Sequence, residues 1–120
     1  MARKNSMMTG GALWGGLALN GSVAAALTAA GNSQATALAL VDDVNIVTTT
    51  AASSGVIVPT MLAGDNITIS NFGANALAVY PPVGGKLSNA ATNTATSLAA
   101  NKSMKVYCVD ALTYAGVVGG

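Results

Sequence analysis

The feature that most constrains this fold is a two-residue alternation of apolar and polar side chains from about residue 34 onward. In DNITIS, residues 65–70, Ile67 and Ile69 alternate with polar neighbours, and in ALAVY, residues 76–80, Leu77 and Val79 share one side of the strand while Tyr80 faces the other. Residues two apart lie on one face of a β-strand. Such runs, separated by Gly, Asn, Asp and Pro, predict seven or eight strands in a small all-β domain, an antiparallel β-sandwich or barrel.

The segment before this pattern is rich in alanine and glycine. Within it, Ser22 precedes VAAALTAA and Gly31 follows it, which predicts a short helix because Ser favours the N-cap and Gly the position after a helix. A helix of this length is marginal alone and needs docking to hold it. We therefore expect an N-terminal docking arm over residues 1–33 and a β domain over residues 34–120.

Two other interpretations of the N-terminal segment are weaker. A basic MARK followed by an apolar stretch resembles a secretory signal peptide, but Asn20, Gly21 and Ser22 interrupt the stretch. The same break, together with several glycines, fits poorly with the roughly 20 apolar residues that a membrane-spanning helix needs. A docking arm is the favoured interpretation, and we expect no membrane partner.

The arm contains the best candidates for contacts with a partner. Large apolar and aromatic side chains dominate interface energies, so Leu13, Trp14 and Leu17 are the expected anchors. Arg3 and Lys4 would face solvent or an acidic partner.

The chain carries unusually little charge. Charged residues make up 8% of the sequence and the net charge is +1, against roughly 25% charged residues in ordinary domains. A surface so neutral keeps a monomer poorly soluble and is explained if partners cover it. We expect a homo-oligomer, with a closed trimer favoured. The balanced charge does not give the basic patch typical of nucleic-acid binding.

The residue inventory argues against an enzyme. Histidine and glutamate are absent, and the four carboxylates are Asp42, Asp43, Asp65 and Asp110. Asp42 and Asp43 are neighbours and would point to opposite faces of a strand, so a hairpin turn suits them better. Asp65 follows Gly64 and also indicates a turn. No catalytic, cofactor-binding or metal-binding residues are predicted, and no cofactor is expected.

The one cysteine, Cys108, lies in MKVYCVD. A single cysteine cannot form an intramolecular disulfide. The surrounding alternation predicts that it is a small buried side chain of a strand and not a reactive thiol.

The stretch NFGANALAVYPPVGG, residues 71–85, is rich in turn-forming residues and has no carboxylate, basic side chain or thiol. We expect residues 71–75 to connect two neighbouring strands, with Gly73 and Asn75 supplying positive φ angles. Pro81 and Pro82 should end the second strand, because proline cannot donate a ladder hydrogen bond.

Three segments together resemble a known module. They are SGVIVP at 54–59, AGDNITISNFGANALAVYPPVGGKL at 63–87 and SLAANKSMKVYCVD at 97–110. In combination they are similar to a small β module of tailed-bacteriophage virion structural proteins. The resemblance implies a non-catalytic virion component of the head-decoration or fibre type, and it covers about half of the chain.

Two functions are therefore predicted. The first is a capsid decoration or cement protein that binds the major capsid protein or another virion protein on the capsid exterior and stabilises the particle. The alternative is a tail or fibre domain that recognises a cell-surface glycan. Glycan sites usually expose aromatic side chains, whereas Tyr80, Tyr107 and Tyr114 fit core or rim positions with their hydroxyls bonded.

Overall fold

The computed structural model describes residues 22–119, and these residues form ten β-strands in two sheets. The all-β class predicted from the alternation is confirmed, and no residue in 22–119 is helical. The strands are β1 (Val23–Thr28), β2 (Leu38–Ala39), β3 (Val44–Thr49), β4 (Gly55–Ile57), β5 (Asn66–Asn71), β6 (Leu77–Tyr80), β7 (Lys86–Leu87), β8 (Thr96–Leu98), β9 (Lys102–Asp110) and β10 (Thr113–Gly119).

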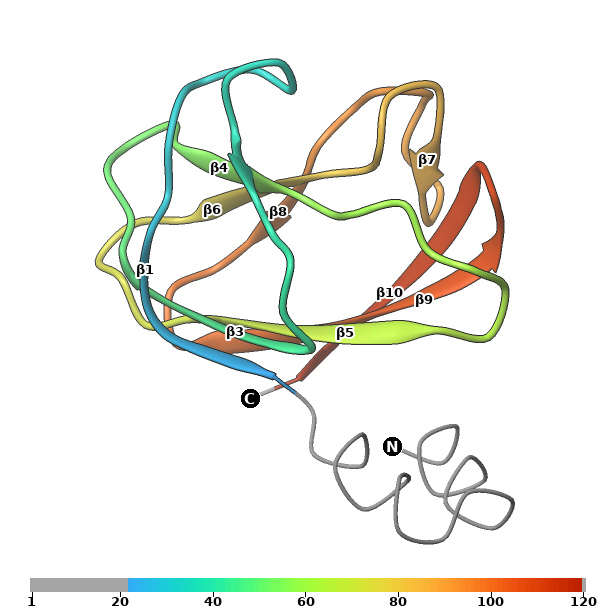
Figure 1. Ribbon diagram of the computed structural model, residues 1–120. Coiled ribbons are helices and arrows are strands. Elements are labelled where there is room, and N and C mark those ends of the chain that lie inside the picture. Colours follow the sequence, from blue (N-terminus) through green and yellow to red (C-terminus); the bar gives the residue numbers. More distant parts are fainter. Residues whose placement is uncertain (1–21, 120) are drawn as a thin grey trace, which may run out of the picture.

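The first six strands alternate between the two sheets, so the chain winds as a coil (Figure 1). The six-stranded sheet has the order β1-β3-β5-β9-β10-β7, and the four-stranded sheet has the order β2-β4-β6-β8. Each turn of the coil contributes one strand to each sheet, and β1, β3 and β5 pair in parallel, as do β2, β4 and β6. Strands β8 and β9 then pair antiparallel to β6 and β5. The fold is thus solenoid-like with mixed sheets, and the prediction of an antiparallel sandwich or barrel is wrong.

The register shows how long each turn of the coil is. In the six-stranded sheet Val23 pairs with Val44, 21 positions later, and Val44 pairs with Thr68, 24 positions later. In the four-stranded sheet Leu38 pairs with Val56, 18 positions later. Parallel pairing of this kind requires a connection that returns the chain to the same end of the sheet, and here the strand in the opposite sheet makes that return.

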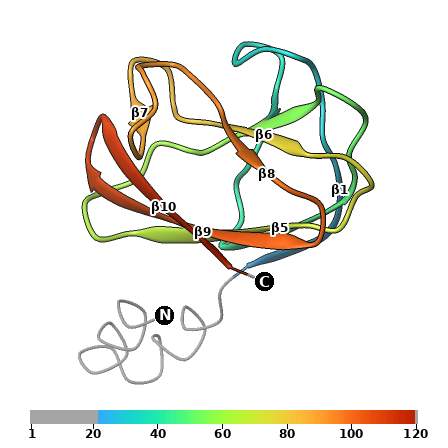
Figure 2. The same ribbon diagram turned by 180° about the vertical axis from the view of Figure 1, so that it is seen from behind.

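The two sheets face each other (Figure 2), and one hydrophobic core lies between them. Both layers contribute inward side chains at alternate positions, as the period-two pattern requires. Most of them are aliphatic and almost fully buried: Ala29, Leu40, Val47, Val56, Val58, Ile67, Ile69, Leu77, Val79, Leu87, Leu98, Met104, Val106, Cys108 and Tyr114. The core therefore holds the coil together across its layers.

The predicted helix after Ser22 is wrong, because these residues form strand β1. The strand pairs with β3, the amide of Ala29 donates to the carbonyl of Thr49 at 2.9 Å, and Leu27 packs against the core. Alanine's helix preference is worth only tenths of a kcal/mol per residue, and sheet pairing outweighs it. Gly31 does adopt a positive φ of 65°, but in the turn that leads from β1 toward β2. Residues 22–33, expected in the arm, therefore include a strand of the larger sheet.

The expected connection at residues 71–75 is also corrected. Strands β5 and β6 belong to different sheets, so these residues turn a corner of the coil and do not join neighbouring strands. Neither Gly73 nor Asn75 has a positive φ. Gly73 is needed for another reason: a Cβ atom at this position would lie 2.6 Å from the backbone nitrogen of Thr50. The predicted end at the two prolines is confirmed, because β6 stops at Tyr80.

The turns predicted at Asp42, Asp43 and Asp65 are confirmed only in part. Asp42 and Asp43 precede β3 and follow β2, which lie in different sheets, so the pair occupies a coil corner and not a hairpin. Asp65 does lie at a turn, where its Oδ2 accepts the amide of Leu62 at 3.3 Å.

A buried asparagine, Asn71, organises the corner between β5 and β6. Its side chain is fully buried. Its Nδ2 donates to the carbonyls of Asn75 at 2.8 Å and Leu98 at 3.0 Å. Its Oδ1 accepts the hydroxyl of Thr50 at 2.8 Å and the amide of Gly73 at 3.0 Å. An asparagine side chain can make four such bonds, so Asn71 is fully satisfied and links the third turn of the coil to the second turn and to β8.

Replacing Asn71 with Ala should destabilise the fold strongly. The change leaves two carbonyls, one hydroxyl and one amide without their partner inside the protein, and we expect a loss of about 2–4 kcal/mol in the free energy of unfolding. Asn75→Ala is the matched control, because Asn75 is exposed and loses one side-chain bond, to the carbonyl of Thr50. Urea unfolding measures both variants, and equal losses would contradict the role given to Asn71.

Gly73→Ala should destabilise the protein although the φ angle of Gly73 suits any residue. The added Cβ would overlap Thr50, and relieving such an overlap costs about 1–3 kcal/mol. Gly119→Ala is the control, since a Cβ there meets no atom within 4 Å. Thermal unfolding should separate the two variants by several degrees, and an unchanged midpoint for Gly73→Ala would show that the corner relaxes freely.

Candidate functional site

The outer face of the six-stranded sheet is the most extended candidate surface of the described chain. One row of paired residues crosses five strands: Val23, Val44, Thr68, Lys105 and Val117. A second row joins Asn66, Tyr107 and Ala115, and a third joins Ile46, Ser70, Ser103 and Gly119. On β3, β5 and β9 the residues between them point into the core. The rows therefore define a continuous surface, which we call the outer face.

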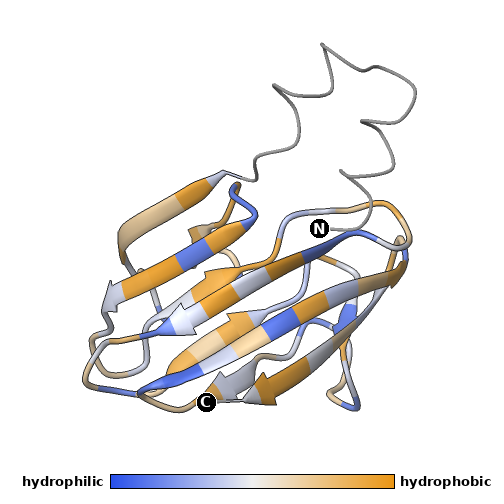
Figure 3. Ribbon diagram, turned by 90° about the horizontal axis from the view of Figure 1, so that it is seen from below, coloured by the Kyte–Doolittle hydropathy of each residue, from blue (hydrophilic) through white to orange (hydrophobic). Residues whose placement is uncertain are grey.

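The outer face carries several exposed apolar side chains among polar ones. Val23 is 61% exposed, Val117 is 58% exposed and Tyr107 is 39% exposed, and the next outward residue on β9, Val109, is exposed as well. Lys105 is the one charged residue in the three rows. Figure 3 looks onto this sheet, where hydrophobic and hydrophilic residues are interspersed along neighbouring strands. Monomeric proteins rarely expose contiguous apolar patches, and a larger patch marks an interaction site or an aggregation liability.

Three of the four carboxylates accept hydrogen bonds from backbone amides. The Oδ2 of Asp43 accepts the amide of Ser22 at 3.1 Å, and the Oδ1 of Asp110 accepts the amide of Leu112 at 2.9 Å. The Asp110–Leu112 hydrogen bond is the main reason why the pKa of Asp110 is lowered. With Asp65 at its own turn, three of the four carboxylates bind backbone amides in loops. Within residues 22–119 no three His, Cys, Asp or Glu side chains gather where they could hold a metal ion.

Cys108 and Tyr114 form a buried pair at the end of the core. The thiol of Cys108 donates to the carbonyls of Met61 at 3.2 Å and Asp110 at 3.1 Å, and the hydroxyl of Tyr114 donates to the carbonyl of Ala111 at 3.2 Å. Burial raises the pKa of both groups. Thiolate formation is therefore disfavoured, and the prediction that Cys108 is a buried strand residue is confirmed.

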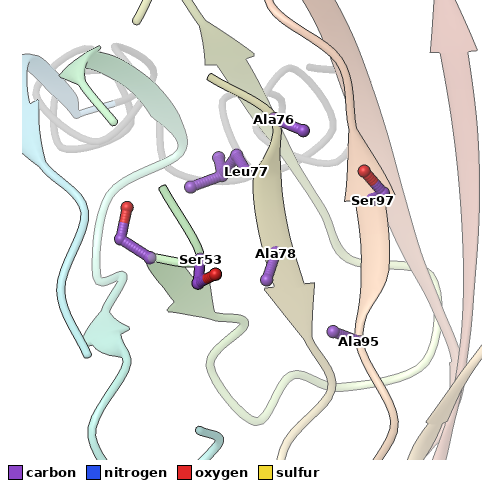
Figure 4. Close-up of a pocket in the computed structure, with 7 residues that line it drawn as sticks. Ser53, Ala76, Leu77, Ala78, Ala95 and Ser97 are labelled. Atoms are coloured by element: carbon purple, nitrogen blue, oxygen red, sulfur yellow. The ribbon is translucent and has the colours of Figure 1, made fainter. Parts of the chain in front are cut away.

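A hollow of about 330 Å³ opens on the four-stranded sheet (Figure 4). Its lining comes from the corner before β4, from β6 and from β8: Ser53, Ser54, Ala76, Leu77, Ala78, Ala95 and Ser97. The hydroxyl of Ser54 already donates to the carbonyl of Ala51 at 2.7 Å. The lining offers hydroxyls and methyl groups but no titratable or aromatic side chain, so it has neither a general base nor a stacking platform.

The five predicted contact residues, Arg3, Lys4, Leu13, Trp14 and Leu17, lie outside the described residues. The outer face was not predicted as a site, although its signal is present in the sequence. In MKVYCVD the inward series Met104, Val106 and Cys108 leaves Lys105, Tyr107 and Val109 outward. An outward series that is mostly apolar on a long strand indicates a covered face. Tyr114 is a core residue with a bonded hydroxyl, as expected, whereas Tyr107 is exposed.

Comparisons of the chain with models of protein families, with curated proteins and with solved structures found no match in any of the three. Among the described residues there is no helix that could cross a membrane.

The thiol of Cys108 should react very slowly in the folded protein. Burial and a raised pKa both reduce the accessible thiolate, so disulfide exchange with a small aromatic disulfide at pH 8 should be at least about 100-fold slower than in urea-unfolded chain.

The raised pKa of Cys108 also determines how the stability of the protein depends on pH. The unfolded chain loses the Cys108 proton at a lower pH than the folded chain, so stability should fall as the pH rises above about 8.5. Rapid reaction without urea would contradict the burial of this group.

Proposed function

We propose that this protein is a non-enzymatic structural protein of a tailed-bacteriophage virion, a capsid decoration or cement protein that binds the capsid exterior as a homo-oligomer. The observation that carries the proposal is the outer face, a long sheet surface with several exposed apolar side chains and one charge in its three rows. Such a surface gains stability when a partner covers it, because each Å² of apolar area removed from water contributes roughly 25 cal/mol.

Two further observations support a structural role. Asp43, Asp65 and Asp110 each accept a backbone amide at a turn, and burial disfavours the thiolate form of Cys108. The three segments that resemble the phage module correspond to the coil and its closing strands: β4 in the first segment, β5, β6 and β7 in the second, and β8 and β9 in the third. The resemblance therefore follows the folded core of the protein and not a loop.

A closed trimer is the favoured assembly, because a ring with three-fold symmetry matches three-fold sites of a capsid and leaves no open interface. Multiple attachment points would then add avidity to weak individual contacts. The partner surface on the particle is the major capsid protein or another virion protein, and binding to it stabilises the shell by mass action.

Glycan recognition by a tail or fibre protein is less well supported. The hollow on the four-stranded sheet is the natural place for a small ligand, but its lining lacks the aromatic side chain on which a sugar ring could stack. No described feature favours this function over attachment through the outer face.

Charge introduced on the outer face should break the assembly without unfolding the protein. Val117→Lys and Tyr107→Glu place charges at exposed positions of neighbouring rows, so the thermal midpoint should shift by less than about 2 °C while sedimentation changes from trimer to monomer. Ser97→Lys, which is exposed on the other sheet, is the control and should remain trimeric. A wild-type chain that sediments only as a monomer at micromolar concentration would contradict the proposal.

The contribution of the arm is tested separately. Leu13→Ser combined with Trp14→Ser should reduce binding to particles at least about 10-fold, since an interface anchor is worth more than about 1.4 kcal/mol. The oligomer should persist. Point variants are preferable to a long truncation, because removing residues 1–30 would delete β1. If the double variant still decorates particles fully, the attachment site lies in the β domain and not in the arm.

A further inference from the structure

The hollow on the four-stranded sheet exists because one outward row of that sheet has only small side chains. Gly55 pairs with Ala78 and Ala78 pairs with Ser97, so these three residues form a row across β4, β6 and β8. Leu77, the neighbour of Ala78 on β6, is fully buried and points into the core, so the row itself faces outward. No side chain in the row is larger than serine, and Ala78 and Ser97 line the hollow of about 330 Å³ (Figure 4).

Strand β8 is an edge of this sheet, and the hydrogen bonds of β6 show which of its backbone groups face the open side. The amide of Ala78 donates to the carbonyl of Ser54 at 3.1 Å, so the backbone of Ala78 is directed toward the β4 side. The residues before and after Ala78 are then directed toward β8, because backbone groups alternate along a strand. Their partners on β8 flank Ser97. The N–H and C=O of Ser97 therefore point away from β6, toward the open edge, where Ser97 is exposed.

The edge of β8 and the hollow beside it are uncharged. The lining residues belong to three segments, 44–64, 66–85 and 87–101, and none of these contains an acidic or basic residue. Strand β8 also contains no lysine or proline and pairs with β6 without a bulge, although such features commonly keep other strands away from an exposed edge. A charged side chain would lose its water in the hollow without gaining an opposite charge. The site therefore favours an uncharged occupant.

An open strand edge and an adjacent hollow are the two parts of a β-strand addition site. Main-chain hydrogen bonds to the edge hold an extended peptide, and the hollow selects one of its side chains. In a strand added beside β8, the residue opposite Ser97 has its Cβ on the same face, roughly 4.5–5.5 Å from that of Ser97. Because Ser97 is small, a long side chain at that position can reach across it into the hollow. The volume of about 330 Å³ lies near the lower end of the range of about 300–1,000 Å³ for ligand sites, which suits a single side chain.

We propose that β8 and the hollow form a peptide-binding site for an extended, uncharged segment of another protein, with one large apolar side chain (Leu, Met, Phe or Trp) seated in the hollow. The backbone of this segment pairs with the N–H and C=O of Ser97. Strand β8 has three residues, so the added strand makes few backbone bonds and the hollow provides most of the selectivity. The inference goes beyond the proposed function and does not depend on it, because β8 and the outer face belong to different sheets.

Titration of the full-length, isotope-labelled chain with short peptides tests the inference by nuclear magnetic resonance. The probes are acetyl-Thr-Thr-Leu-Thr-Thr-amide and the peptides with Met, Phe or Trp at the centre. At least one of them should shift the amide signal of Ser97 and the methyl signals of Ala78 and Ala95, and should slow the exchange of the Ser97 amide. Peptides with Asp or Lys at the centre are the controls and should bind at least about 10-fold more weakly, because burying an unpaired charge is costly.

Two pairs of variants separate the hollow from the edge. Ala78→Leu fills the hollow and should abolish peptide binding, whereas Ala39→Leu, at an exposed position of the same sheet, should not change it. Ser97→Pro removes the N–H at the edge, where proline is tolerated, and should weaken binding roughly 2- to 10-fold, the value of one backbone hydrogen bond. Ser97→Ala keeps the N–H and should bind nearly as well as the unmodified chain. Thermal unfolding checks that each variant is folded.

Three results would overturn the inference. If none of the four apolar peptides shifts the Ser97 signal of the unmodified chain, there is no such site, and this result requires no variant to fold. Equal binding of the apolar and the charged peptides would show that the hollow does not select a side chain. Protection of the Ser97 amide that increases with protein concentration in the absence of peptide would show that a second copy covers the edge. None of these measurements involves particles or the outer face, so they separate this inference from the proposed function.

Discussion

The fold depends on the hydrogen bonds of one buried side chain, Asn71. A polar group removed from water is costly unless all its bonds are remade, and Asn71 makes four. Its partners belong to three segments: Thr50 after β3, Gly73 and Asn75 in the next corner, and Leu98 at the end of β8. The backbone joins in, because the carbonyl of Asn71 accepts the amide of Asn101 at 2.7 Å. The side chain of Asn71 therefore fixes the spacing between the corners of successive turns of the coil. With its backbone carbonyl, it also fixes the position of the turn between β8 and β9.

The glycine of this corner follows from the same constraint. Thr50 must approach closely enough for its hydroxyl to reach Asn71, and this leaves no room for a Cβ at position 73. Another fully buried asparagine, Asn45 near the start of β3, is only half satisfied: its Nδ2 donates to the carbonyls of Asp42 and Thr68, and its Oδ1 has no hydrogen-bond partner within the described residues. The coil is thus held by aliphatic packing between its sheets and by asparagine amides at its corners. The fold can therefore be stable although only 8% of the residues are charged, because its specific polar contacts are hydrogen bonds between buried groups.

The sequence predicts the strands better than it predicts their partners. Alternation in residues 65–70 and the prolines after Tyr80 identified the core face of β5 and the end of β6, since these signals are local. Period two is the same in parallel and antiparallel sheets, so it could not reveal that β5 pairs with β3 and β9. The alanine run of β1 led to the wrong prediction of a helix, because the helix preference of alanine is weak and pairing with β3 decides the conformation of these residues. For the site, the anchor residues predicted in the arm precede the described residues. The outer face could have been inferred from the outward series on β9, but its extent depends on the cross-strand register.

These features define a small coil with a nearly uncharged sheet face, suited to burial against other subunits. The most direct test of the proposed role is electron cryomicroscopy of purified tailed-phage particles, to determine whether they carry this chain and where. The account predicts many copies on the capsid exterior, arranged as trimers, with Tyr107 and Val117 covered by a neighbouring subunit or by the capsid. Particles with only a few copies at the tail, and with the outer face of the six-stranded sheet open to solvent, would contradict it.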